Sequence, residues 1–145
     1  MNTRVIVATV AGGAALFLLG FVVYGLMLES WMESQMVKHD GLMLPAPNFV
    51  TLIIANVTWA LLLSLIFDRW ASIRTFAGGL VGGAMVGFLV ILYKDLMTLS
   101  FMNIFNSYTP LAVDVCAFTV IGAISGGVVG AVLGMMDRAP SESMA

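Results

Sequence analysis

Residues 75–93 have the sequence TFAGGLVGGAMVGFLVILY, and this stretch decides the fold of the chain. Its 19 residues lie between Arg74 and Lys94 and carry no charge. The hydrocarbon core of a bilayer is about 30 Å thick, and a helix needs roughly 20 mostly apolar residues to cross it. The stretch therefore predicts a transmembrane helix.

Three other stretches lack charge over a similar length. They comprise 24 residues between Arg4 and Glu29, 27 between Asp40 and Asp68, and 22 between Asp114 and Asp137. Together they predict four spans, at about residues 5–28, 49–67, 76–95 and 111–136. None of these spans has a charged residue near its middle, where ion-coupled transporters and many membrane enzymes keep one.

The composition agrees with a membrane location. The chain has 145 residues, is 61% hydrophobic and has a mean hydropathy of +1.05. A soluble domain of this size could not bury so much apolar surface, whereas a bilayer solvates it. We expect an all-α integral membrane protein, with one four-helix bundle over residues 1–138 and a disordered polar tail at 139–145.

The basic residues predict the orientation of the bundle. Four arginines fall on one side of the predicted membrane, and Lys38 and Lys94 fall on the other. By the positive-inside rule, both termini are expected in the cytoplasm. On the outer side, residues 29–38 are expected to form a short amphipathic helix at headgroup depth, and residues 96–105 to continue the third span near the interface.

Glycines recur at every fourth position in the last two spans, so they share one face of each helix. Glycine at such positions lets two helix backbones approach closely, which stabilises helix pairs in membranes. The predicted packing residues are Gly78, Gly82 and Gly83 in the third span and Gly122, Gly126, Gly130 and Gly134 in the fourth. We favour packing within this bundle; packing against another copy or another subunit is the alternative.

Four charged residues are predicted to lie at one level near the outer surface: Glu29, Lys94, Asp95 and Asp114. A Lys94–Asp114 pair is geometrically reasonable. The favoured interpretation is a structural ion pair or interfacial anchor, because long side chains can reach the headgroups at this depth. A site for a small ligand, a lipid headgroup or an ion is the alternative.

Asn56 is expected near the middle of the second span, with Trp59 one turn further along on a similar face. A mid-membrane amide should face the bundle and bond to a neighbouring helix. Interhelical contact is therefore the favoured role, and contact with a pore or substrate is the alternative.

The sequence lacks the residues that several classes of function require. The chain has only six Lys and Arg residues and a net charge of −2, which is too little positive charge for a nucleic-acid-binding surface. His39 and Cys116 are the only residues of their kinds, so no disulfide, metal centre, cofactor site or catalytic constellation is predicted. We expect Cys116 to be an inert buried thiol, because its neighbours are apolar.

The pattern Gly20-Phe-Val-Val-Tyr24-Gly25, then Trp31, then Asn56-x-x-Trp59, then Asp95 and Asp114, resembles small four-span bacterial membrane proteins of a domain-of-unknown-function family. The resemblance covers nearly the whole chain. It implies a four-helix bundle in a bacterial inner membrane, and it implies no activity.

The leading hypothesis for function is a non-enzymatic membrane protein in contact with the lipid bilayer. It would be an accessory or structural subunit of a larger membrane complex, or a small homo-oligomer held by glycine-rich helix faces. The alternative is a small transporter or channel that uses Lys94, Asp95 and Asp114. Small multidrug exporters have a similar length and four spans, but they carry a carboxylate deep in the first span, and residues 5–28 contain none.

Overall fold

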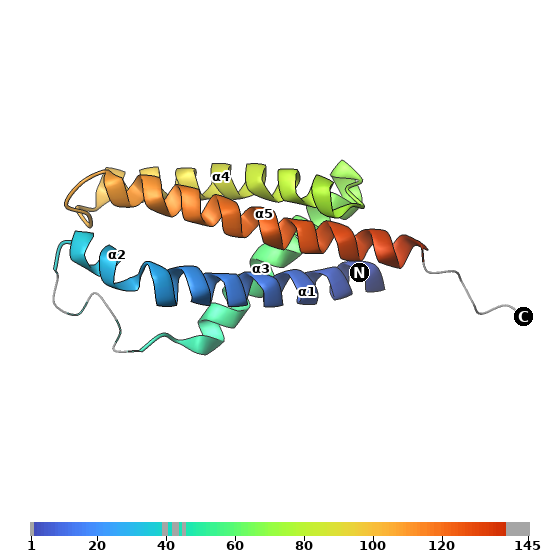
Figure 1. Ribbon diagram of the computed structural model, residues 1–145, viewed down its shortest axis with the longest axis horizontal. Helices are drawn as coiled ribbons and strands as arrows, with labels where there is room; N and C mark the ends of the chain where they lie inside the picture. The colour runs from blue at the N-terminus through green and yellow to red at the C-terminus, as the bar shows by residue number, and fades with distance from the viewer. Residues whose placement is uncertain (1, 39–40, 42–43, 45, 139–145) are drawn as a thin grey trace, which may run out of the picture.

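The computed structural model describes residues 2–38, 41, 44 and 46–138, and most of this part of the chain is helical. The helices are α1 (Thr3–Gly20), which continues into the π-helical segment η1 (Phe21–Met27), α2 (Glu29–Gln35), α3 (Phe49–Leu65), which continues into the π-helical segment η2 (Ile66–Ala71), α4 (Phe76–Phe101) and α5 (Thr109–Arg138) (Figure 1). The predicted disordered tail, 139–145, lies outside the described residues, as does His39.

Four helical stretches are long and apolar enough to cross a membrane: Thr3–Met27, Phe49–Ala71, Phe76–Phe101 and Thr109–Arg138. The predicted all-helical fold with four potential spans is therefore confirmed, while the orientation of the termini stays a prediction. The third stretch continues beyond residue 95, as expected for residues 96–105, but it ends at Phe101, and the fourth extends two residues beyond its predicted span at each end. The predictions ended near the charged residues, whereas a helix can continue past the hydrocarbon core into the headgroup layer.

The four long helices form an open bundle (Figure 1). The most extensive pairing joins α4 to α5, which are antiparallel neighbours in the sequence. On its other side α5 packs along α1, and α3 packs mainly on α1, which it crosses obliquely. We call the end of the bundle that holds α2 and the α4–α5 connection the α2 end, and the opposite end, where α1 begins and α5 ends, the terminal end.

Two side chains mark where the middle helices begin. The side-chain oxygen Oδ1 of Asn48 accepts a hydrogen bond from the backbone N–H of Thr51, at 3.2 Å, and the Thr75 hydroxyl accepts one from the backbone N–H of Gly78, at 3.1 Å. Such N-caps satisfy backbone donors that a helix start leaves without partners. The uncharged run at residues 75–93 therefore begins with its own helix-start signal.

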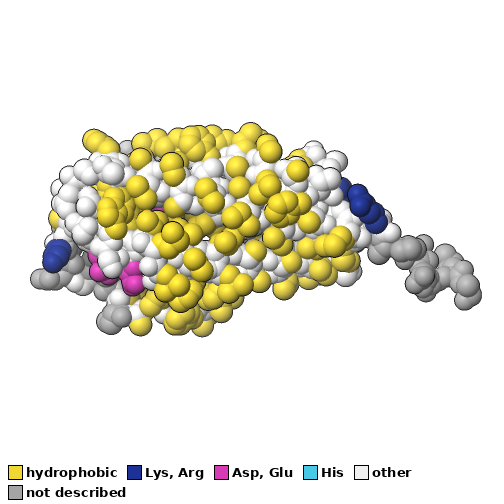
Figure 2. Space-filling model, in the orientation of Figure 1, with side chains coloured by type: hydrophobic (Ala, Val, Ile, Leu, Met, Phe, Trp, Pro, Cys, Tyr) yellow, Lys and Arg dark blue, Asp and Glu magenta, His cyan; other side chains and the backbone are white. Residues whose placement is uncertain are grey.

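Apolar side chains cover the middle of the molecule, and charged side chains gather at its two ends (Figure 2). Inside, a fully buried cluster joins α1, α3, η2 and α5 in the terminal half: Ala8, Leu63, Phe67, Val129 and Leu133. Many large apolar side chains elsewhere are exposed. That distribution suits a bundle whose surrounding solvent is lipid.

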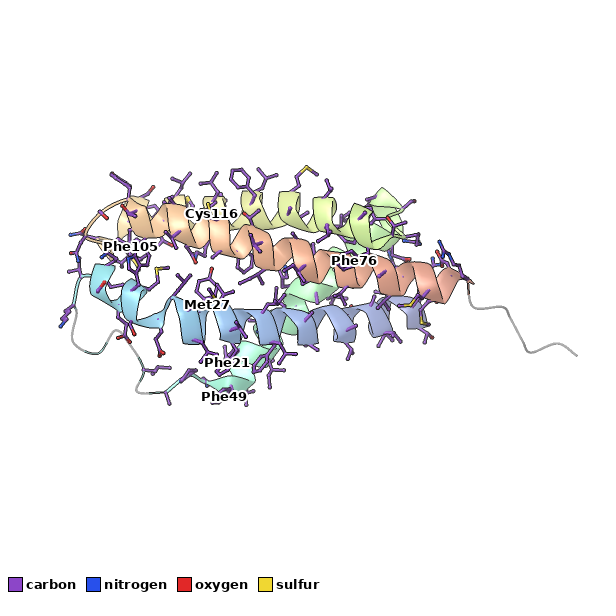
Figure 3. All side chains as sticks on the ribbon, viewed as in Figure 1. Phe21, Met27, Phe49, Phe76, Phe105 and Cys116 are labelled. Atoms are coloured by element: carbon purple, nitrogen blue, oxygen red, sulfur yellow. The ribbon has the colours of Figure 1, made fainter. Side chains whose placement is uncertain are left out.

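The predicted helix over residues 29–38 is shorter than expected, because α2 ends at Gln35. Met36 instead forms an isolated antiparallel β-bridge with Phe105. The Val37 N–H donates to the Ile104 carbonyl, at 2.9 Å. These bonds hold the end of α2 against the α4–α5 connection, where Figure 3 places Phe105.

Candidate functional site

Four side chains from three helical segments meet near the α2 end, and we call them the carboxyl cluster: Tyr24, Lys94, Asp95 and Asp114. The Tyr24 hydroxyl donates to Asp114 Oδ1, at 2.5 Å. Lys94 Nζ lies 2.8 Å from Asp95 Oδ1 and 3.4 Å from Asp114 Oδ2. The ammonium group therefore bridges two carboxyl groups, one from its own helix and one from α5.

The two carboxyl groups of the cluster are enclosed, and the lysine is not. Asp95 is 3% exposed and Asp114 is 8% exposed, whereas 57% of the Lys94 side chain is exposed. A long lysine side chain can keep its charged group at the headgroup layer while its stem lies along apolar surface. Lys94 thus connects two buried carboxyl groups to the exterior at this end.

The glycine spacing explains why the two carboxyl groups face each other. Asp95 continues the four-residue spacing of Gly79, Gly83, Gly87 and Ile91, all of them buried. Asp114 stands in the same register as Gly122 and the glycines after it. Because these two faces pack against each other, the residues that end them on the α2 side lie close together.

Tyr24 reaches the cluster from η1. In this segment the helix widens to the π form over residues 21–27. Such widened turns change the direction of side chains and are frequent at functional sites. The Tyr24 hydroxyl lies within 3.5 Å of the Asp114 backbone oxygen as well as bonding to its carboxylate. From the sequence, Tyr24 was noted only as part of the pattern that resembles a family. Neither its spacing nor its charge predicted that it would be a partner of Asp114.

The other predicted polar residues lie apart from the carboxyl cluster. Glu29 begins α2 at the same end, but its side chain is exposed, and the described residues give it no ion pair. Trp59 packs edge-on against Phe118 of α5, with ring centres 5.1 Å apart, and the described residues offer its buried Nε1 no hydrogen-bond partner. Trp59 therefore belongs to the α3–α5 contact.

The prediction that Asn56 bonds to a neighbouring helix is wrong. Its Nδ2 donates to the Leu52 carbonyl, one turn earlier in the same helix, at 2.7 Å. The reason is the oblique crossing of α3, which leaves residues 49–55 exposed and brings the amide no hydrogen-bond partner from another helix in the described part of the chain. Asn56 instead borders an apolar pocket of about 350 Å³ between α1 and α3, lined by Gly13, Ala14, Phe17, Leu18, Ile53, Asn56 and Val57.

The glycines of α4 and α5 lie at different contacts. A Cβ on Gly83 would collide with the Gly122 carbonyl oxygen, and one on Gly126 would lie 2.5 Å from the Gly79 carbonyl oxygen. The α4–α5 approach is thus backbone on backbone. Three of the predicted packing residues meet other segments: Gly78 faces the Thr75 hydroxyl, Gly82 faces Phe67 and Ile73, and Gly134 faces the Arg74 backbone. Gly130 contacts the Thr75 carbonyl oxygen and Gly79.

A second charged group, at the terminal end, was not predicted from the sequence. Asp68 Oδ1 lies 2.9 Å from Arg4 Nε and 3.0 Å from Arg74 Nη2. Asp137 pairs with the same two arginines. We call these four residues the ion-pair network; it joins α1, η2 and α5. The arginines were predicted only to orient the bundle, although oppositely charged residues close together at one membrane face were a signal for pairing.

The chemistry available at these sites is that of charge and protons. Within residues 2–38, 41, 44 and 46–138, no three His, Cys, Asp or Glu side chains are grouped to hold a metal ion. The prediction of a buried Cys116 is wrong, because this residue of α5 is exposed (Figure 3). Comparisons with protein-family models, with curated proteins and with solved structures found no match, so the resemblance to a family of unknown function stays a prediction.

Proposed function

We propose that this chain is a non-enzymatic integral membrane protein that serves as a structural subunit and assembles through the open side of α3. The half-exposed amide of Asn56, beside an apolar pocket, is the observation that carries the proposal. Its Nδ2 bonds within α3, but an amide has a second N–H and a carbonyl oxygen to satisfy. Lipid chains offer neither donor nor acceptor, so a polar group of another helix would stabilise this amide.

The glycine-rich faces of α4 and α5 do not supply this contact. Their glycines pack inside one chain, either between α4 and α5 or against the segment that precedes α4. The expectation of an oligomer held by those faces is therefore replaced by one held through α3. Residues 49–55 are exposed, and Figure 3 shows the labelled Phe21 and Phe49 on the same side of the molecule, near the start of α3.

A second copy of the chain is the occupant that fits this face. An asparagine amide is both donor and acceptor, so two copies related by a twofold axis could each donate to the other at Asn56. Gly13 and Ala14 border the same pocket and leave room for a close approach. The basic residues and the family resemblance support a bacterial inner membrane with both termini in the cytoplasm.

Native mass measurement in a mild detergent tests the proposal. The wild-type protein should be a dimer, and Asn56→Leu should shift it to monomer. Thr58→Val is the matched control, because the Thr58 hydroxyl is bonded to the Ile54 carbonyl within the same exposed helix, at 2.7 Å. This variant should stay dimeric. A different subunit that is lost in Asn56→Leu would support assembly through α3 with another partner, and a wild-type monomer without a partner would overturn the proposal.

A small transporter or channel is the second candidate, and the burial of Asp95 and Asp114 favours it. Ionisable groups enclosed in membrane spans often lie on ion or proton paths. Ion or proton flux into liposomes should then be lost in Asp95→Asn and Asp114→Asn and kept in Glu29→Gln. Wild-type liposomes that show no flux above empty liposomes would exclude this candidate.

A further inference from the structure

We propose that the carboxyl cluster is a proton-binding site that holds one exchangeable proton on Asp95. The carrying observation is Asp95 Oδ2, a buried oxygen with no hydrogen-bond partner among the described residues. An ionised carboxylate oxygen left without a donor in an apolar enclosure is costly. A proton on that oxygen removes the charge and makes the cost much smaller.

The balance of charges in the carboxyl cluster also indicates one bound proton. With both aspartates and Lys94 ionised and Tyr24 neutral, two carboxylates face one ammonium, which leaves one negative charge in excess. Because Lys94 Nζ touches both, the two carboxyl groups lie within about 6 Å of each other, a range in which like charges oppose simultaneous ionisation. One added proton makes the cluster neutral.

The neighbouring donors select Asp95 over Asp114. Both oxygens of Asp114 have a donor, Oδ1 from the Tyr24 hydroxyl and Oδ2 from Lys94. Asp95 has only Lys94, at Oδ1. From η1, α4 and α5, the charged or titratable groups that contact these carboxyl groups in the described residues are Tyr24 and Lys94. The carboxylate with two donors is stabilised as the anion, and the other carries the proton.

A proton fits this place better than a metal ion. The Lys94 ammonium already occupies the position between the two carboxyl groups that a cation would take. The bound proton comes from hydronium in the surrounding water: an O–H bond of hydronium breaks, an O–H bond forms at Asp95 Oδ2, a water molecule is left, and no oxidation state changes. The half-exposed Lys94 lies between the buried pair and the exterior, so exchange takes place at the α2 end.

Infrared spectroscopy of the purified protein in lipid bilayers tests this site without any assumption about partners or transport. The C=O stretching band of a protonated carboxyl group should be present at neutral pH and disappear in alkaline buffer. Asp95→Asn should abolish the band. Asp114→Asn should abolish it too, because Asp95 would then pair one-to-one with Lys94. Glu29→Gln, which changes an exposed carboxylate at the same end, should leave it unchanged.

Lys94→Gln should change the infrared band in the opposite direction, by increasing it. Without the ammonium both carboxyl groups are expected to be protonated, so the area of the band should about double. Circular dichroism confirms that each variant is folded. A wild-type spectrum without the band overturns the proposal, as does a band that persists in Asp95→Asn or in Asp114→Asn.

Discussion

Ser72 adopts a left-handed backbone conformation, with φ of 51° and ψ of 35°, directly after η2. This conformation costs a non-glycine residue roughly 1–2 kcal/mol, and glycine adopts it freely. Ser72→Gly should therefore raise the free energy of unfolding by about 1 kcal/mol, measured by denaturant titration in detergent. Ser72→Ala keeps the strained backbone and should give no gain; equal gains for both variants would contradict the explanation.

The Tyr24–Asp114 hydrogen bond allows a direct measurement of coupling across the carboxyl cluster. Hydrogen bonds between membrane helices contribute about 0.6 kcal/mol on average and up to about 1.7 kcal/mol. The 2.5 Å bond to a buried carboxyl group should lie in the upper part of this range. A double-mutant cycle of Tyr24→Phe and Asp114→Ala measures it, because alanine leaves the tyrosine hydroxyl no side-chain acceptor at position 114. Additive effects of the two substitutions would show that the bond contributes nothing.

The α4–α5 pair depends on the absence of side chains at its contact. Gly83→Ala should lower the free energy of unfolding by about 1–3 kcal/mol, because the added methyl group meets backbone that cannot rotate away. Gly20→Ala is the control, since beyond its chain neighbours and the adjacent backbone of its own helix no atom lies within 4 Å of the added methyl group. Alanine has a higher helix propensity than glycine, so Gly20→Ala should leave the free energy of unfolding unchanged or raise it by up to about 1 kcal/mol. Unfolding curves of the two variants in the same detergent decide the matter.

The sequence predicted the helices well because their main determinant is local: the length of each uncharged run. It also indicated the glycine faces, and continuing the same spacing to Asp95 and Asp114 would have predicted that these two residues meet. Other contacts depend on geometry that spacing does not contain. The tilt of α3 removed the partner expected for Asn56, and the widened turn of η1 brought Tyr24 to Asp114.

The ion-pair network fixes the terminal end of the whole molecule, and its two carboxylates are not equivalent. The Asp68 side chain is 7% exposed and the Asp137 side chain 32% exposed, although both pair with Arg4 and Arg74. Asp68→Asn should lower the free energy of unfolding by about 1–3 kcal/mol, because it leaves two arginines close together without a buried counter-charge. Asp137→Asn should cost less. Unfolding titrations at low and high salt measure both, and the reverse order would contradict the role of burial.

Helix α5 is held near both of its ends, by Asp114 in the carboxyl cluster and by Asp137 in the ion-pair network. At 1.5 Å per residue these two carboxyl groups lie about 35 Å apart along the helix. In a thinner bilayer, a helix that is not bound to its neighbours can relieve hydrophobic mismatch by tilting independently of them. Here α5 cannot tilt without breaking contacts to α1 and α4, so the bundle must tilt as one body or the surrounding lipid must deform.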